Sequence, residues 1–531
     1  MRCPSIPLLT TIYKPNFFIL PTSLQNTCIA HRASRSIFLL LVLIGVLSGC
    51  KNKQKSELIW NKDLALIGSQ SSPRTADLNN DGVLDIVMGA GQNEFQKSAQ
   101  GIIAFDGKTG DILWQQEGLD QVYGSATFYD INADKTPDIF IGGRSPHFKA
   151  MDGKTGSILW EYKFAYESDP IMQYARFNFN NSVLVPDQNS DGLMDLLTVN
   201  GGNANAQPNT TADRYPGVLM VLDSKNGNII AADTMPDGNE SYMSPLCFQQ
   251  PGQSDYTIVF GTGGETISGH LYSGTLKQLM RKDLKSAAVI ASETGHGFIA
   301  PPSAADINKD GYLDIVAISH GSSVFAIDGR SAKQLWRQHI EGTESSNSLA
   351  VGHFNNDDIP DFFTFVSKGQ WPNSTGSVQI MLDGTDGHVA FTDSIGCTGY
   401  SSAVVYDLNN DGVDEAIISV NEFDCSFGFT GKSPATVENK LIAIDFVKHD
   451  IISLDQSMGF KNIFSTPWIG DLDDDGYLDI VHCQYYHVSD LLFFLGMKIK
   501  RIDTPIKIRK PVAWGAYMGS RGNGCFVDAP N

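Results

Sequence analysis

A nine-residue motif of oxygen-bearing side chains occurs seven times along this 531-residue chain. In its fullest form, DLNNDGVLD at residues 77–85, Asp or Asn occupies positions 1, 3, 5 and 9, and Gly occupies position 6. Carboxylate and amide oxygens at this spacing on a tight turn are the ligands that calcium prefers, and the Gly permits the sharp bend. The sequence therefore predicts a series of structural calcium-binding loops.

The predicted ligands come from all seven loops. They are Asp77, Asn79, Asp81, Asp85, Asp130, Asn132, Asp134, Asp138, Asp187, Asn189, Asp191, Asp195, Asp306, Asn308, Asp310, Asp314, Asn355, Asp357, Asp361, Asp407, Asn409, Asp411, Glu415, Asp471, Asp473, Asp475 and Asp479. We expect about five to seven bound Ca²⁺ ions, with dissociation constants on the order of 10⁻⁴–10⁻³ M as in extracellular modules. The alternative is that some loops form Asx turns without metal.

Two loops depart from the pattern. Lys135 replaces the Gly in the loop 130–138, and in the loop 353–361 His353 replaces the first oxygen donor and Asp358 replaces the Gly. An imidazole is a poor ligand for a hard cation. The sequence leaves open whether these two loops hold metal.

The loops recur about every 50–60 residues, a period typical of propellers, solenoids and arrays. One step is twice as long, which predicts a degenerate, metal-free loop near Cys247. Each repeat contains short runs of Ile, Val, Leu and Phe bounded by Gly, Asn and Asp, as in AFDGKTGDILW at 104–114. We therefore predict an all-β fold, an eight-bladed β-propeller of four-stranded antiparallel blades.

The last repeat lacks a fourth strand that ends in Trp, whereas the segment SELIW at 56–60 is such a strand without a repeat of its own. We expect this N-terminal strand to complete the eighth blade, which would remove the exposed sheet edges. Residues 56–531 would then form a single propeller.

The first 50 residues have a different composition. They contain no acidic residue, and an apolar run ends in LSGC at Cys50. The run is too short to span a bilayer and ends in small residues, as a signal peptide does. We expect a signal peptide at 1–49, a short linker at 50–55 and export from the cell.

The net charge is −20, and no basic stripe accompanies it, so we expect no nucleic-acid partner. The acidity is largely accounted for by the predicted metal ligands. An exported protein can form disulfides, and Cys397–Cys425 and Cys483–Cys525 are plausible pairs, with Cys247 as a buried thiol. Sequence alone leaves the connectivity open.

The repeats resemble those of known families over about residues 56–526. The DxNxDGxxD loop with its short strand resembles the FG-GAP repeats of integrin α-type and related bacterial propellers, including VCBS-like repeats. The AxDGxTGxxLW phrase resembles PQQ-like propeller repeats, and LSGC resembles a bacterial lipobox. The resemblance implies calcium sites, lipidation of Cys50 and anchoring at a bacterial membrane, in the outer membrane or at the cell surface.

No catalytic residues can be assembled from the sequence. PQQ-dependent dehydrogenases have a vicinal Cys–Cys pair, which this chain lacks, so we expect no PQQ. GxSxG, HExxH and P-loop motifs are also missing from the sequence. We expect a binding or scaffold module for a protein or glycan; the alternative is a calcium-dependent glycan-active enzyme such as a rhamnogalacturonan-type polysaccharide lyase.

The order of strands in a four-stranded blade predicts where a ligand would bind. The first–second and third–fourth connections lie on one face, and the second–third connections and the links between blades lie on the other. The calcium loops and the DGKTG turns should share one face, and the long insertions at 200–217, 367–377 and 421–440 should share the other. That second face, the ligand face, should carry Arg144, Tyr215, Tyr242, His296, Trp371, Tyr400 and Tyr486. Aromatic side chains with scattered polar groups suit glycan or peptide binding; the alternative is local packing of ordinary loop residues.

Overall fold

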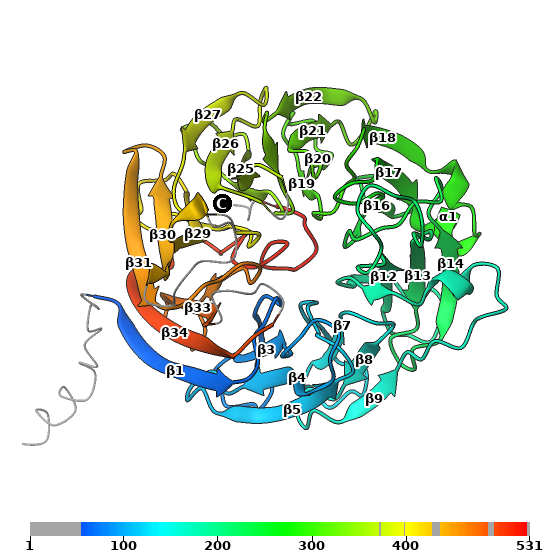
Figure 1. Cartoon of the computed structure of the whole chain (residues 1–531), viewed down its shortest axis with the longest axis horizontal. Helices are drawn as coiled ribbons and strands as arrows, with labels where there is room; N and C mark the ends of the chain where they lie inside the picture. Colours follow the sequence, from blue (N-terminus) through cyan, green and yellow to red (C-terminus); the bar gives the residue numbers. More distant parts are fainter. Residues whose placement is uncertain (1–54, 371–372, 398, 427–435, 487–492, 528–531) are drawn as a thin grey trace, which may run out of the picture. The chain divides into compact units, whose positions relative to one another are not determined.

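The computed structural model describes residues 55–370, 373–397, 399–426, 436–486 and 493–527. The signal peptide, Cys50 and Trp371 lie outside the described residues, as does the linker except for Lys55. The described residues belong to one compact unit, Lys53–Asn531. Its strands form eight antiparallel sheets arranged as blades around a centre (Figure 1), which confirms the predicted eight-bladed propeller.

The first four blades run in chain order around the ring. Blade 1 is β2 (Arg74–Ala76), β3 (Asp85–Gly89), β4 (Ser98–Phe105) and β5 (Ile112–Gly118); blade 2 is β6 (Thr127–Tyr129), β7 (Asp138–Gly142), β8 (Phe148–Met151) and β9 (Ile158–Glu161). Blade 3 is β10 (Asn178–Phe179) and β11 (Val183–Val185), both paired with β12 (Asp195–Gly201), then β13 (Val218–Leu222) and β14 (Ile229–Thr234). Blade 4 is β15 (Leu246–Phe248), β16 (Thr257–Gly261), β17 (Gly269–Thr275) and β18 (Ala288–Glu293).

The second half repeats this plan. Blade 5 is β19 (Ser303–Ala305), β20 (Asp314–Ile318), β21 (Ser323–Ile327) and β22 (Gln334–His339); blade 6 is β23 (Thr343–Glu344), β24 (Ala350–Gly352), β25 (Asp361–Lys368), β26 (Gly376–Leu382) and β27 (Val389–Asp393). Blade 7 is β28 (Val404–Tyr406), β29 (Glu415–Glu422), β30 (Glu438–Asp445) and β31 (Asp450–Met458). Blade 8 is β32 (Trp468–Gly470), β33 (Tyr477–Tyr485) and β34 (Gly496–Lys507). The described helices are short: η1 (Met172–Tyr174), α1 (Leu276–Met280) and η2 (Leu284–Ser286).

The eighth blade is closed by the N-terminal strand. β1 (Glu57–Ala65) pairs antiparallel with β34, with Ala65 opposite Gly496. The predicted closure is therefore confirmed. It joins the two ends of the ring by hydrogen bonds instead of leaving two open edges.

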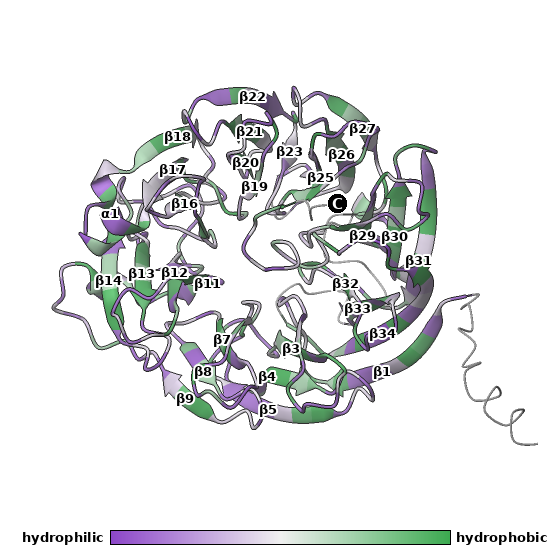
Figure 2. Ribbon diagram, turned by 180° about the vertical axis from the view of Figure 1, so that it is seen from behind, coloured by the Kyte–Doolittle hydropathy of each residue, from purple (hydrophilic) through white to green (hydrophobic). Residues whose placement is uncertain are grey.

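The blades pack through their middle strands. The second strand of each blade is buried on both faces, as in β3 and β20, whereas outer strands such as β5 alternate buried and exposed residues. Figure 2 shows the corresponding hydrophobic colouring of the strands and the hydrophilic loops between them. This pattern follows because the second strand has a neighbouring blade on each side of its sheet.

Tryptophans near the outer edge connect successive blades. The indole N–H of Trp336 in β22 donates to the carbonyl of Gly384, 2.8 Å away in the next blade, and its ring covers Gly387. Three further tryptophans, Trp60, Trp114 and Trp160, donate in the same way to Gly107, Gly153 and Ser224. We call this arrangement the Trp clasp. It explains why the chain repeats a Trp at the end of the fourth strand.

The degenerate repeat is blade 4, and its position in the chain is confirmed. Cys247 lies inside β15, however, so Gln249 rather than Cys247 follows the inner strand as the first loop residue. Thr257 then begins β16, where the other blades have the ninth carboxylate. Instead, the side chain of Gln250 makes two hydrogen bonds to the backbone of Leu313 in the next blade. Its amide nitrogen donates to the Leu313 carbonyl, and its amide oxygen accepts from the Leu313 N–H.

One of the two plausible disulfides is present. Cys397 and Cys425 are bonded, with a sequence separation of 28 and their Cα atoms 5.4 Å apart. Cys483 and Cys525 are free and buried, as is Cys247, so the second pairing is wrong. Cys483 lies within β33, whereas the backbone of Cys525 forms an isolated β-bridge with Ala304 of β19.

Removal of the disulfide should destabilise the protein. A double Cys397→Ser, Cys425→Ser variant should lose about 3–4 kcal/mol of unfolding free energy, because a cross-link of this loop length restricts the unfolded chain. Urea unfolding with and without dithiothreitol measures the loss. Reductant should shift the wild-type midpoint and leave the double variant unchanged; equal shifts in both would contradict the prediction.

Candidate functional site

In four of the seven Asp-rich loops, the ninth residue ties the loop to the hairpin turn of the same blade. One carboxylate oxygen of Asp85 accepts from the backbone N–H of Leu78 at 2.9 Å, and the other accepts from Gly107 in the DGKTG turn at 2.9 Å. Asp138, Asp314 and Asp361 make the same pair of bonds in their blades. The loops and the turns therefore share one face, as predicted.

The loop backbone forms a nest, a tight turn in which successive backbone N–H groups point at the first carboxylate. In the loop 77–85, the amides of Asp81 and Gly82 both donate to the Asp77 carboxylate, and Asn80 and Gly82 have positive φ angles of 59° and 85°. The loops beginning at Asp130, Asp187, Asp306, Asp407 and Asp471 have positive φ at the same two positions. Lys135 adopts this conformation at φ 75°, which is costly for a residue with a Cβ atom.

The loop 353–361 has a different backbone. Neither Asn356 nor Asp358 has a positive φ angle. The backbone N–H of His353 donates to Asp414 of the neighbouring blade at 3.0 Å. The two hydrogen bonds to Asp361 are kept in this loop, but the nest is not. His353, at the first position, instead makes a contact between two blades.

The loop carboxylates are crowded in a way that suits a divalent cation. Burial raises the pKa of Asp85, Asp138, Asp195, Asp314 and Asp479 to about 6, and that of Asp361 and Glu415 to about 7. Oxygens of Asp411, Glu415 and Asp445 lie within 4.8 Å of one another. Buried oxygens of Asp195 and Asp473 make no hydrogen bond. A hard cation would satisfy these oxygens and offset the clustered charge, so the residues fit calcium.

The eighth blade differs in a way that the sequence did not indicate. The guanidinium of Arg501 in β34 is buried and donates to Asp479 at 2.9 Å and to Asp473 at 2.6 Å. Its third nitrogen donates to Gly107 of blade 1. The positive charge of Arg501 therefore partly neutralises the loop 471–479. In this blade the hairpin turn of the other blades is missing.

A single substitution removes the charge of one ninth carboxylate, and its effect on metal binding is measured as the calcium-dependent part of the stability. In Asp85→Asn, the amide keeps one acceptor oxygen but loses the negative charge. We expect calcium to stabilise this variant by about 1–2 kcal/mol less than it stabilises the wild type, the contribution of one weak site at millimolar calcium. Thermal unfolding with calcium and with chelator measures the difference. Thr257→Asn, at the equivalent position of blade 4, is the control and should leave the calcium effect unchanged.

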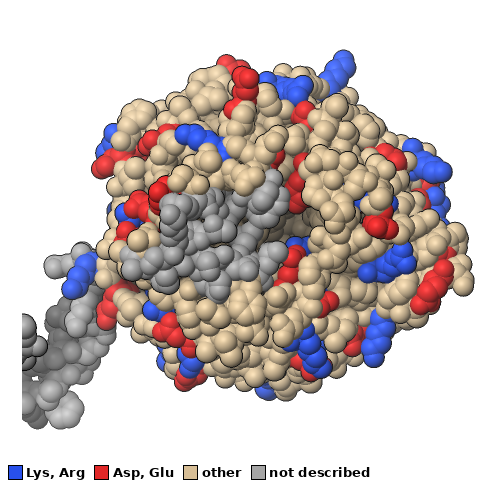
Figure 3. All heavy atoms as spheres, in the orientation of Figure 1, with Lys and Arg blue, Asp and Glu red and all other residues tan. Residues whose placement is uncertain are grey.

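The ligand face contains every described residue that was predicted to lie there. Arg144, Tyr215 and Tyr486 follow second strands, and Tyr242, His296 and Tyr400 lie in links between blades. This face is opposite the Asp-rich loops. Figure 3 shows one face of the molecule, on which acidic and basic side chains are interspersed around a central hollow.

Arg144 and Tyr242 each lie beside charged side chains. Arg144 forms an ion pair with Glu94 and lies 4.8 Å above the Tyr123 ring. The hydroxyl of Tyr242 donates to Glu240 at 3.4 Å, and Glu240 forms an ion pair with Arg214. Burial, together with the charges of Glu240 and Glu265, raises the pKa of Tyr242.

Tyr400 and Tyr486 are packed locally. Tyr400 is buried and stacks on Phe464 with 5.6 Å between ring centroids. Tyr486 makes an edge contact with Phe460 at 5.7 Å. For these two side chains, the alternative of local packing describes what the structure shows.

Tyr215 belongs to a stacked aromatic group that the sequence did not reveal. Its ring lies 5.6 Å from Phe177 and 6.3 Å from Tyr174, nearly parallel to both. The exposed Arg176 lies 4.8 Å above the same ring. Tyr174, Arg176 and Phe177 come from the link between blades 2 and 3, so only the folded chain brings them to Tyr215. We call these four residues the aromatic platform.

The C-terminal segment enters the centre of the ring (Figure 1). The amide of Val405 donates to Trp514, Ile469 donates to Gly515, and Ala304 forms a bridge with Cys525. Trp514 is almost completely buried. The segment is therefore part of the propeller core, which explains the aromatic and glycine-rich sequence at 513–526.

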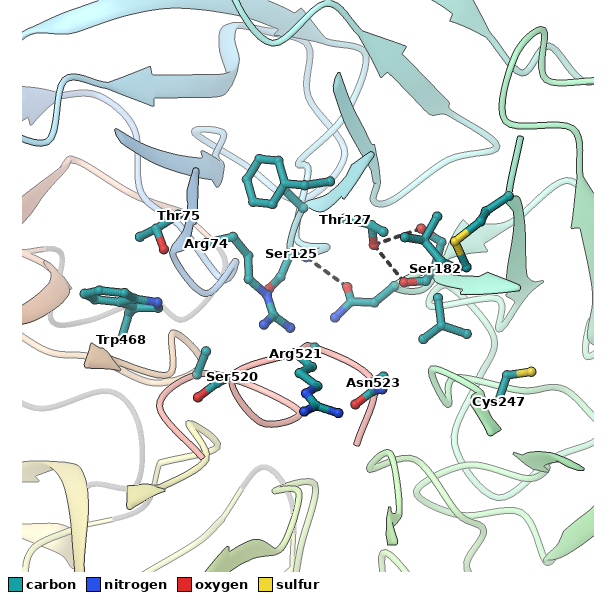
Figure 4. A pocket seen from close by; sticks show the side chains of 18 residues that line it. Arg74, Thr75, Ser125, Thr127, Ser182, Cys247, Trp468, Ser520, Arg521 and Asn523 are labelled. Atoms are coloured by element: carbon teal, nitrogen blue, oxygen red, sulfur yellow. Dashed lines mark hydrogen bonds between the residues drawn. The ribbon is translucent and has the colours of Figure 1, made fainter. Parts of the chain in front are cut away.

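A cavity of about 330 Å³ lies between this segment and the inner strands. Figure 4 shows Arg74 and Arg521 beside it, together with hydroxyl and amide side chains. No acidic residue is among the described residues that line it. Arg74 donates to the carbonyl of Tyr517, and burial lowers its pKa to about 10. No pattern in the sequence indicated this cavity, because its walls combine segments that are far apart in the chain, such as those of Arg74 and Arg521.

Comparison with solved structures shows the propeller fold. A europium-containing methanol dehydrogenase is 10% identical, with a TM-score of 0.54 over 84% of this chain and 93% of that one. A quinohemoprotein alcohol dehydrogenase from Pseudomonas putida HK5 is 10% identical, with a TM-score of 0.51 over 86% and 77%. BamB from Moraxella catarrhalis is 10% identical, with a TM-score of 0.46 over 84% and 99%. At such identities the similarity concerns the fold and not the activity.

Three further findings concern the sequence and its membrane topology. No curated protein matches the chain. In the part of the chain that the structure describes, no helix is long and apolar enough to cross a membrane. The model of the FAM234A/B beta-propeller family matches residues 90–395. Since this match spans more than half of the 531 residues, the chain belongs to the FAM234A/B beta-propeller family.

Proposed function

We propose that this protein is an exported, lipid-anchored β-propeller that is stabilised by calcium and binds a protein or glycan ligand at the bacterial cell envelope. The β-propeller fold supports the proposed role as a binding or scaffold module. The FG-GAP-like loops supply the proposed calcium ligands at five to seven sites, and the LSGC segment supplies the proposed lipidation site at Cys50. No PQQ is part of the proposal.

The observation that carries the binding role is the aromatic platform on the ligand face. Tyr174, Phe177 and Tyr215 are only partly buried, and their rings are nearly parallel. Aromatic rings offer an apolar surface with little side-chain freedom to lose, and Arg176 adds a cation beside it. Such a group suits the apolar face of a sugar or an aromatic side chain of a peptide.

Binding can be tested with defined polysaccharides. Affinity electrophoresis of the full chain in calcium buffer, with polygalacturonate, rhamnogalacturonan or soluble peptidoglycan in the gel, should show retardation by at least one of them if the ligand is a glycan. Tyr215→Ala and Phe177→Ala should reduce the retardation. Tyr312→Ala is a matched control, because this tyrosine also has an arginine, Arg330, 5.2 Å from its ring but lies in a calcium loop.

The same samples distinguish binding from catalysis and test the anchor. Accumulation of unsaturated uronate products from rhamnogalacturonan would support the lyase alternative. Retardation that is equal in all variants would contradict a role for the aromatic platform. In bacteria, Cys50→Ser should move the protein from the membrane fraction to the soluble fraction; no change would contradict lipid anchoring.

A further inference from the structure

Three residues with metal-binding side chains converge on the ligand face, away from the calcium loops. His296 lies in the link from blade 4 to blade 5, His320 in the β20–β21 connection, and Glu344 in β23. One ligand atom from each lies within 4.8 Å of the other two. His320 and Glu344 are buried, with exposed fractions of 2% and 6%.

Both imidazoles are held by partners behind them. The Nδ1 atom of His296 lies 2.7 Å from the carbonyl oxygen of Glu265. Since a carbonyl only accepts, Nδ1 carries the proton of the neutral ring, which leaves the lone pair of Nε2 available to a metal ion. The Nδ1 atom of His320 lies 3.3 Å from the hydroxyl of Ser346. Metal-bound histidines typically use the second ring nitrogen in this way, which fixes the tautomer and the ring orientation.

The remaining ring nitrogen of His320 faces into the cluster. Its Nε2 atom is buried, makes no hydrogen bond, and lies 3.3 Å from a carboxylate oxygen of Glu344. The backbone of His320 is fixed at both ends, by its amide to Gly297 and by its carbonyl to Ser345, at 2.8 Å each. A simple ion pair between His320 and Glu344 does not account for the position of His296, whose ring centroid lies 5.6 Å from that of His320.

The backbone leaves room for the His296 ring. A Cβ atom on Gly321 would lie 2.9 Å from Cδ2 of His296, which is closer than packing allows. The glycine thus lets the β20–β21 connection approach the imidazole. This contact joins two of the three segments at the cluster.

We propose that His296, His320 and Glu344 bind a divalent transition-metal ion of the Zn²⁺ class. Two imidazole nitrogens and one carboxylate oxygen are a ligand set that Zn²⁺ accepts, and three protein ligands leave a coordination position for water or a ligand group. Calcium is the wrong ion, since it prefers oxygen donors in larger number. This site is additional to the binding role proposed above and does not depend on it.

The test uses tag-free full chain in saturating calcium, so that the Asp-rich loops do not compete for zinc. Isothermal titration with Zn²⁺ should give one site, and Co²⁺ should give the visible absorption of a nitrogen- and oxygen-ligated ion. His296→Ala and His320→Ala should each weaken binding about 100-fold or more, and Gly321→Ala about 10- to 100-fold, because the added Cβ atom would displace the His296 ring. His270→Ala, on the same face but outside the cluster, should bind like wild type.

The outcomes separate the alternatives. Because His320 is buried, its variant is interpreted only if its far-ultraviolet circular dichroism is native; His296 is partly exposed, so His296→Ala provides an independent answer. Loss of zinc in His296→Ala with retention in His270→Ala supports the site. No zinc binding by wild type, or equal binding by all variants, would overturn it and leave a buried histidine–glutamate pair.

Discussion

Calcium should raise the unfolding temperature of this protein by on the order of 5–10 °C. A weak site with a dissociation constant of about 10⁻⁴–10⁻³ M contributes about 0.6–1.8 kcal/mol at about 2 mM calcium. Five to seven such sites contribute roughly 3–13 kcal/mol together, and a propeller of this size has a large unfolding entropy, so each kcal/mol shifts the midpoint by about 1 °C. Differential scanning calorimetry with calcium and with chelator measures the shift.

The physical reason for the shift lies in the ninth carboxylates. They are buried among other carboxylates, which raises their pKa values. Among the described residues, only Asp479 of these carboxylates forms an ion pair with a cation, Arg501. Magnesium at equal concentration is the control, and it should have a smaller effect because it gives up its water reluctantly. If calcium leaves the midpoint unchanged, the loops are metal-free turns.

Disruption of one Trp clasp should have the second largest effect. In Trp336→Ala, the protein loses a buried indole ring, its packing on Gly387 and its hydrogen bond to Gly384. Truncation of a buried aromatic side chain costs about 3–5 kcal/mol. Trp336→Phe keeps most of the ring and should cost about 1–2 kcal/mol, mainly from the unsatisfied carbonyl. Urea unfolding in calcium buffer measures both.

A neighbouring residue provides the matched control for the clasp. Leu335 lies on the same strand, is 40% exposed and points to the opposite side of the sheet. Leu335→Ala should change the stability by about 0.5 kcal/mol or less. If Trp336→Ala unfolds at the same urea concentration as Leu335→Ala, then the contact between blades 5 and 6 does not depend on the clasp.

The repeated sequence determined the architecture, because its signals are local. A loop with oxygens at fixed spacing, a buried strand and a turn lie within about 40 residues, so each repeat predicts one blade. The unpaired strand at 56–60 then predicted closure with β34, and Cys397–Cys425 was among the plausible pairs. The same reasoning placed Cys247 two residues from its position in the fold, since a degenerate loop has no carboxylate to fix the register.

The tertiary structure alone decided which side chains from separate strands and links meet. Arg501 enters the loop 471–479, Tyr215 stacks on Phe177, and His296 meets His320 and Glu344. Each contact joins residues from different strands or links, whose separation depends on how strands pair and blades stack rather than on any local pattern. Spacing in a sequence can specify a loop that binds one ion within a repeat, but a site shared between repeats exists only once the ring has closed.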